Sequence, residues 1–139
     1  MAGYSGTPLA KKLGIKQDAA VLLSGAPAGF EETLEGLPSG VKITRSTRAK
    51  GSFDVIVAFV EVAGGVAKAF ESLAPKLTSA GGLWIAWPKA EHRKDAELTE
   101  TLIREVGLRA LDGALVDNKV CAVSEVWSGL RFVRRLDRR

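Results

Sequence analysis

The chain has 139 residues, of which 46% are hydrophobic and 26% charged, and its formal net charge is +4. This composition is typical of a globular protein and excludes a mainly disordered or fibrous chain. The excess positive charge lies entirely within residues 131–139, which hold five Arg and one Asp, whereas the residues before them are balanced in charge.

Several classes of protein are excluded at this stage. No apolar run approaches the 18 residues that span a bilayer, and the first residues lack the apolar stretch of a secretory signal. One cysteine, Cys121, and one histidine, His92, exclude an intrachain disulfide and a cysteine–histidine zinc cluster. We therefore expect a reduced, cytoplasmic bacterial-type protein with no membrane association and no metal site.

The first part of the chain predicts short elements. After a flexible arm, a helix begins at Thr7-Pro8 and ends at Gly14. The apolar run 19–23 predicts a strand that is buried on both faces. A turn over 24–29 then leads into about two helical turns over 30–37.

The next strand poses a problem of connection. Residues 41–44 alternate between apolar and polar, which is typical of an exposed edge strand. Only residues 45–52 separate it from the next strand, too few for a crossover helix. We expect an extended crossover or, failing that, an antiparallel edge strand.

The middle of the chain predicts longer elements. Residues 53–62 are almost wholly apolar and β-branched, which favours the centre of a sheet. An apolar stripe at helical spacing follows from Val66 to Leu77, with a kink or a split of the helix at Pro75 and a stop at Gly81-Gly82. Residues 83–87 predict a second central strand.

A helix and a hairpin complete the chain. Asp95 is a suitable N-cap for a helix that runs to Val106 and stops at Gly107. Residues 119–126 and 130–133 predict an antiparallel hairpin with its turn at 127–129.

Strands that alternate with helices predict an α/β fold, a compact three-layer sandwich with a mostly parallel sheet and a C-terminal antiparallel hairpin. We expect one domain over residues 1–139. Residues 1–14 form its N-terminal arm and short helix, and residues 136–139 form a basic tail.

Short strings at the start, in the middle and at the end of the sequence carry a resemblance to a family. The chain has GYSGTPL at 3–9 and KLGI at 12–15, then LW at 83–84 and AWPK at 86–89, and near its end Asp117, KVCAV at 119–123 and WSGLRFV at 127–133. With these strings it resembles a family of small, uncharacterised bacterial proteins of about this length. That family brings no established activity.

The order of the predicted elements resembles a truncated class I methyltransferase. The resemblance implies a methyl donor, S-adenosylmethionine, across the carboxyl ends of the first strands. The family carries an acidic residue and alternate glycines after the first strand, and an acidic side chain after the second that takes the ribose hydroxyls. Here the first turn, 24–29, contains Pro27 and no acid, residues 44–48 contain no carboxylate, and a helix and strand after the second strand are missing. The donor-site motifs are therefore degenerate.

The best candidate site is a crevice at the carboxyl edge of the sheet, which forms if the first strand of the hairpin runs parallel to the others. Tryptophan offers apolar area, and Lys or Arg an anion contact. The alternative is that the tryptophans cap a small core. The residues we expect there are Glu61, Trp87, Lys89, Trp127, Ser128 and Arg131.

Other features have two interpretations each. Gly25 and Gly29 precede a short helix that could take an anion, but a tight turn explains them equally. Asp54 falls on the opposite edge, where we expect a structural cap. Cys121 is expected to be an inert thiol. The C-terminal arginines bind an anionic partner or protect a sheet edge from pairing.

Three hypotheses for function follow. The first is a non-catalytic module that binds a small molecule or a protein at the edge of Trp87 and Trp127, without a cofactor. The second is a small methyltransferase that uses S-adenosylmethionine and is completed by homo-oligomerisation. The third is an anion or nucleic-acid binder through the Arg-rich end, although no aromatic platform for bases is visible near it.

Overall fold

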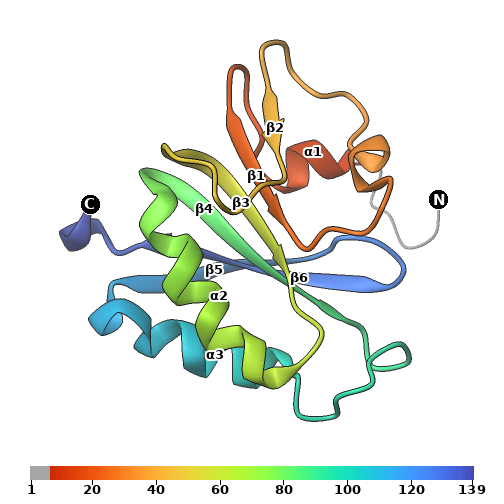
Figure 1. Ribbon diagram of the computed structural model, residues 1–139, viewed down its shortest axis with the longest axis vertical. Helices are drawn as coiled ribbons and strands as arrows, with labels where there is room; N and C mark the ends of the chain where they lie inside the picture. The colour runs from red at the N-terminus through yellow and green to blue at the C-terminus, as the bar shows by residue number, and fades with distance from the viewer. Residues whose placement is uncertain (1–6) are drawn as a thin grey trace.

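Six strands form one mixed sheet in the order β2-β1-β3-β4-β6-β5. The computed structural model describes residues 7–139 (Figure 1); the expected arm at residues 1–6 lies outside the described residues. Neighbours among the first four strands are parallel, and β6 pairs antiparallel with both β4 and β5. The expected α/β fold, with its mostly parallel sheet and C-terminal antiparallel strands, is confirmed. The strands are β1 (Ala20–Ser24), β2 (Lys42–Thr44), β3 (Phe53–Phe59), β4 (Leu77–Pro88), β5 (Leu115–Ala122) and β6 (Trp127–Arg134).

Two helices cover one face of the sheet, α2 (Val66–Leu73) and α3 (Glu100–Arg109), and they lie side by side in the lower left of Figure 1. Their apolar stripes join the side chains of the sheet in one buried cluster. At its centre Phe70 of α2 meets Phe132 of β6 edge to face, with ring centroids 4.8 Å apart.

The other face is covered by much less regular structure. The helix α1 (Leu9–Lys12) and the 3-10 turn η1 (Phe30–Thr33) pack there over a second apolar cluster. Trp84 of β4 is fully buried and its indole Nε1 donates a hydrogen bond to the carbonyl of Leu13, 3.0 Å away. This bond attaches the end of α1 to the centre of the sheet.

The chain crosses from β2 to β3 without a helix. Both strands are parallel to β1, which lies between them, so residues 45–52 form the expected extended crossover. At the amino end of β3, the Asp54 carboxylate accepts a hydrogen bond from the backbone N–H of Ala20 at 2.9 Å. This contact fits the structural role expected for Asp54.

Two helix predictions in the first half of the molecule were too long. The helix expected over 30–37 is the single turn η1, which follows Gly29 in a left-handed conformation (φ +79°). The helix expected from Val66 to Leu77 is split at Pro75, one of the two outcomes expected there: α2 ends at Leu73, and Pro75, which supplies no backbone N–H, lies in the short turn η3 (Ala74–Lys76). Leu77 is already in β4.

Gly81 and Gly82 do not stop a helix, as we expected, but lie inside β4. The pairing of β3 with β4 jumps from Phe53↔Leu77 to Val55↔Gly82, so residues 78–81 form a bulge. Glycine is required there for space: a Cβ on Gly81 would lie 2.8 Å from the carbonyl oxygen of Asp54.

The start and end of α3 also differ from the prediction. The N-cap is Thr99, whose Oγ1 accepts from the N–H of Leu102 at 3.2 Å. Asp95 instead accepts backbone N–H bonds from Ala63, in the turn η2 (Ala63–Gly65), and from Glu97, and these bonds lower its pKa. Gly107 lies within α3, where a Cβ would come within 2.3 Å of the Phe132 ring.

The C-terminal hairpin is confirmed, but its turn is shifted. Residues 127–129, expected as the turn, belong to β6, and the chain reverses over 123–126, where Ser124 Oγ accepts from two backbone N–H groups. The short turns η4 (Ala110–Gly113) and η5 (Leu136–Arg138) flank the hairpin. No helix within residues 7–139 is long and apolar enough to cross a bilayer.

Candidate functional site

The chain changes direction across the sheet between β1 and β3. It steps outward from β1 to β2 and then returns past β1 to β3, so the carboxyl ends of β1 and β3 form a topological switch point, where open α/β sheets bind ligands. A groove of about 550 Å³ opens there between the sheet and α2. Its lining consists of Ser24, Thr47, Ala58, Phe59, Val60, Glu61, Val62, Gly65, Lys68, Ala69, Ser72, Leu73 and Lys76.

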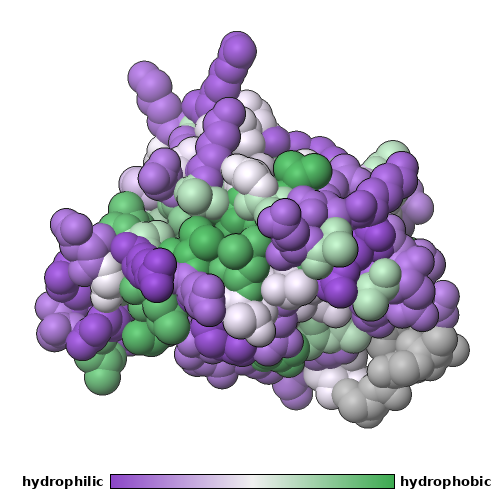
Figure 2. All heavy atoms as spheres, turned by 90° about the horizontal axis from the view of Figure 1, so that it is seen from below, coloured by the Kyte–Doolittle hydropathy of each residue, from purple (hydrophilic) through white to green (hydrophobic). Residues whose placement is uncertain are grey.

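The groove has an apolar floor and a charged rim. Ala58, Val60 and Leu73 are buried beneath it, whereas Glu61 and Lys68 are exposed at its border. The view from below the molecule shows apolar side chains gathered in the middle of that side, surrounded by polar ones (Figure 2). A ligand with an apolar body and polar ends fits such a surface.

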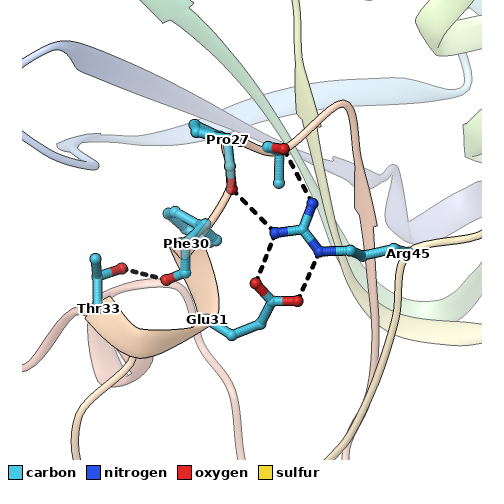
Figure 3. Close-up of polar contacts among 6 residues, drawn as sticks. Pro27, Phe30, Glu31, Thr33 and Arg45 are labelled. Carbon is cyan, nitrogen blue, oxygen red and sulfur yellow. Dashed lines mark hydrogen bonds and ion pairs between the residues drawn. The ribbon is translucent and has the colours of Figure 1, made fainter.

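One arginine organises the turn that follows β1. Arg45 stands directly after β2, and its guanidinium forms a bidentate pair with Glu31 of η1, with Nε–Oε2 and Nη2–Oε1 distances of 2.7 and 2.6 Å (Figure 3). The same guanidinium donates to the carbonyls of Ala26 and Pro27, each at 3.0 Å. These donors hold the pKa of Glu31 at about 2, below its ordinary 4.5.

Gly25 and Gly29 shape the same turn. Both have positive φ, +68° and +79°. A Cβ on Gly25 would lie 3.1 Å from the carbonyl oxygen of Phe59, so the turn passes close to the end of β3. The tight-turn interpretation explains both glycines, and their expected part in ligand binding stays a prediction.

Three aromatic rings stand in a row at the carboxyl edge. Phe59, at the end of β3, meets Phe30 on one side and Trp127 on the other, both edge to face with centroids 5.0 Å apart. The indole of Trp127 therefore packs on the second apolar cluster. Gly29 and Trp127 share the lining of a shallow hollow of about 240 Å³ next to this row.

The single crevice expected from the sequence does not form. Trp87 pairs with Ser128 and Pro88 with Trp127, so both tryptophans do reach the same edge. However, successive side chains in a strand point to opposite faces. Trp87 is 5% exposed and lies in the cluster under α2 and α3, while Trp127 packs on the other face.

The remaining expected residues are dispersed. Glu61 borders the groove beside α2, and the backbone N–H of Lys89 donates to the carbonyl of Val126 at 2.8 Å. Ser128 is half-buried in β6. Arg131 lies opposite Trp84, farther along β6, and lines a separate pocket with residues from the amino end of the sheet. Its expected place beside Trp127 is wrong.

The C-terminal arginines do not protect an open edge, as one interpretation proposed. The edge strand is β5, and β6 lies between β5 and β4. Three of these arginines bind backbone carbonyls instead: Arg134 that of Ala74, Arg138 that of Asp112, and Arg139 that of Arg134.

Sequence reasoning missed the role of Arg45. The stretch after the second strand was interpreted through what it lacks, a carboxylate, and not through what it carries. A detectable signal existed, because Arg45 follows an edge strand and Glu31 begins an acidic turn after the glycine-containing loop.

Two further features concern metal-binding side chains and the Cys121 thiol. Within residues 7–139, no group of three or more His, Cys, Asp or Glu side chains is placed to hold a metal ion. Burial raises the pKa of the Cys121 thiol, and nearby Lys12 and Lys119 offset this only in part. A raised pKa agrees with the inert thiol expected at this position.

Comparison with known proteins places the fold. No family model and no curated protein matches the sequence. Among solved structures, a ribosomal protein methylase from Lactobacillus delbrueckii subsp. bulgaricus is similar, with a TM-score of 0.58 and 15% identity over 91% of this chain and 75% of that one. The fold is that of the class I methyltransferases.

Two further structures are similar to this chain. A precorrin-6y methyltransferase from Geobacter metallireducens has a TM-score of 0.57 and 10% identity, over 91% of this chain and 85% of that one. Magnesium protoporphyrin IX methyltransferase from Synechocystis, solved with bound SAH, has a TM-score of 0.56 and 12% identity, over 91% of this chain and 78% of that one. At these identities the likeness concerns the fold alone.

Proposed function

We propose that this protein is a non-catalytic binding module built on a methyltransferase fold, in which Arg45 closes the position where the fold family anchors its methyl donor. The observation that carries the proposal is the set of four hydrogen bonds from Arg45 to Glu31, Ala26 and Pro27. They connect the two segments, after β1 and after β2, to which the family resemblance assigns the donor contacts.

The chemistry at these two segments opposes the donor. The acidic side chain that the family carries after the second strand accepts from the ribose hydroxyls, and a guanidinium, which has donors only, cannot take over that role. Four of the five N–H donors of Arg45 are already engaged, and releasing them would break a bidentate, charge-assisted pair. Pro27 also removes one backbone N–H from the turn.

The groove beside α2 is the binding surface that we assign to the module. It lies at the switch point, has an apolar floor, and carries Glu61 and Lys68 at its rim. We infer that it takes a small molecule or a protein segment with an apolar body and charged ends.

Isothermal titration calorimetry with S-adenosylmethionine and S-adenosylhomocysteine tests the proposal. The wild-type protein is expected to give no saturable heat with either compound. Arg48→Ala is the matched control for Arg45→Ala, because Arg48 lies three residues farther along the same exposed segment. Neither variant is expected to gain binding, since neither creates an acceptor for the ribose. Saturable binding by the wild type would overturn the proposal.

A second candidate is a methyltransferase that uses S-adenosylmethionine as a homo-oligomer. It is supported by the methyltransferase structures of similar fold and by a groove at the position where this fold binds ligands. If the titration gives saturable binding, sedimentation with and without the donor would then establish whether a second copy completes the site.

A further inference from the structure

A second pocket lies at the opposite end of the sheet from the groove. It has a volume of about 340 Å³ and lies beside the bulge in β4. The lining brings together residues after α1, the start of β3, the bulge and β6, among them Lys16, Asp54, Thr78, Gly81 and Arg131.

Arg131 is the unusual side chain in this pocket. It is half-buried, yet within residues 7–139 no carboxylate lies within 4.0 Å of it. Its one hydrogen bond in that part of the chain goes from Nη1 to the amide oxygen of Asn118, at a long 3.4 Å. By contrast, Arg45 and Arg104 both form ion pairs shorter than 3 Å.

The strand beneath Arg131 is shaped to receive its guanidinium. A Cβ on Gly82 would lie 2.3 Å from Arg131 Nε and 2.7 Å from Cζ. Neither Gly81 nor Gly82 has a positive φ, so these positions are glycine because a side chain would not fit, and not because of their backbone conformation. The glycines therefore form a cradle in which Arg131 rests against the backbone of β4.

The charges around the pocket favour an anion. Lys16 lines it, and burial, together with the neighbouring Arg139, lowers the pKa of Arg131. Asp54 also lines it, but its Oδ2 accepts from the N–H of Ala20 and its Oδ1 from Thr78 Oγ1 at 3.4 Å. A half-buried cation without a counter-charge is costly unless something pairs with it.

We propose that this pocket binds a small organic anion, whose carboxylate or phosphate group pairs with Arg131 and Lys16 while a donor group on the ligand faces Asp54. A guanidinium in a fixed cradle suits either acid, because both accept two parallel N–H bonds. This site is separate from the groove beside α2 and does not depend on the function proposed for it.

Amide and arginine Nε–H NMR spectra, recorded during titration with inorganic phosphate and separately with succinate at constant ionic strength, test the proposal. Saturable shifts are expected at Lys16, Gly81, Gly82 and Arg131. The anion that saturates, or saturates at the lower concentration, identifies the acid group. The absence of saturation with both anions would overturn the proposal.

Two variants that each remove one positive charge distinguish a specific site from a general electrostatic attraction of anions. Arg131→Gln is expected to weaken binding about tenfold or more, the size of one lost charge-assisted contact. Arg135→Gln removes the same charge at an exposed position paired with Asp137 and is expected to leave binding unchanged. Equal weakening by both variants would contradict a specific site. If Arg131→Gln fails to fold, Lys16→Gln takes its place. Lys16→Gln is expected to weaken anion binding severalfold, and unchanged binding would contradict the proposal.

Discussion

Residues 7–52 and residues 53–134 of this protein form the same sheet in different ways. The first region contains strands of five and three residues, a four-residue helix and one 3-10 turn. The second contains strands of seven to twelve residues and helices of eight and ten. The second region supplies most of the buried cluster under α2 and α3. The first region supplies most of the second apolar cluster, and specific hydrogen bonds from Ala20 to Asp54 and from Trp84 to Leu13 also join it to the second region.

The difference shows that the main core and the segments assigned to methyl-donor contacts lie in different regions of the molecule. The second region holds α2, α3 and four of the six strands, and it supplies most of the core under the two helices. The first region holds the segments after β1 and β2 to which the family resemblance assigns the donor contacts, and here Arg45 joins them. Under the proposed function, the change at these segments leaves the core under α2 and α3 in place, because few residues of that core come from the first region.

The largest expected effect comes from the core of the second region. Phe70 is fully buried against Phe132, so Phe70→Ala should lower the free energy of unfolding by about 3–5 kcal/mol through lost burial and a cavity. Urea unfolding measures this. Leu136→Ala, at a side chain that is 81% exposed, is the control and should change almost nothing. A loss below about 1 kcal/mol for Phe70→Ala would contradict a core centred there.

A smaller effect is expected where α3 approaches the sheet. Gly107→Ala places a Cβ 2.3 Å from Phe132 and 2.7 Å from Phe70, and such overpacking costs about 1–3 kcal/mol. Alanine is the better helix former by about 1 kcal/mol, so a net loss would report the clash itself. Gly64→Ala, with nothing within 4 Å, is the matched control in thermal unfolding. Equal stability of the two variants would show that Gly107 of α3 does not pack directly against the rings of Phe132 and Phe70.

The smallest effect concerns the first region and depends on pH. Because the pKa of Glu31 in the folded protein is about 2, below the ordinary 4.5, its pair with Arg45 stabilises the fold above pH 4.5. That contribution is lost as the pH falls through the range from 4.5 to 2. Carbon NMR of the Glu31 carboxyl should give a titration midpoint near 2 in the wild type and a clearly higher one, closer to the ordinary 4.5, in Arg45→Met, where the Arg45 hydrogen bond is lost but the backbone hydrogen bond remains. A midpoint near 4.5 in the wild type would mean that the pair does not persist in solution.

Sequence reasoning performed well where one physical signal dominated. Unbroken apolarity placed β1, β3 and the carboxyl half of β4, and the length of 45–52 predicted the crossover. It was less successful where tertiary contacts decide. Gly81, Gly82 and Gly107 look like helix stops, but they are glycines because Asp54, Arg131 and Phe132 come too close for a Cβ.

The candidate site was predicted only in part. The carboxyl edge was the right place to look, and Glu61 does border the groove there. The pleat then separates Trp87 from Trp127, and the shifted hairpin turn moves Arg131 to the other pocket. These outcomes depend on strand register, which no short pattern in the sequence specifies.

The central claim is that the turn after β1 is closed by Arg45 and does not admit the methyl donor. Amide NMR during titration of the wild-type protein with S-adenosylhomocysteine tests it most directly, because it reports binding and location together. The account predicts no saturable shifts in residues 24–31 or at Arg45 at millimolar ligand. Saturable shifts confined to those residues, with the Glu31 carboxyl released from Arg45, would contradict it.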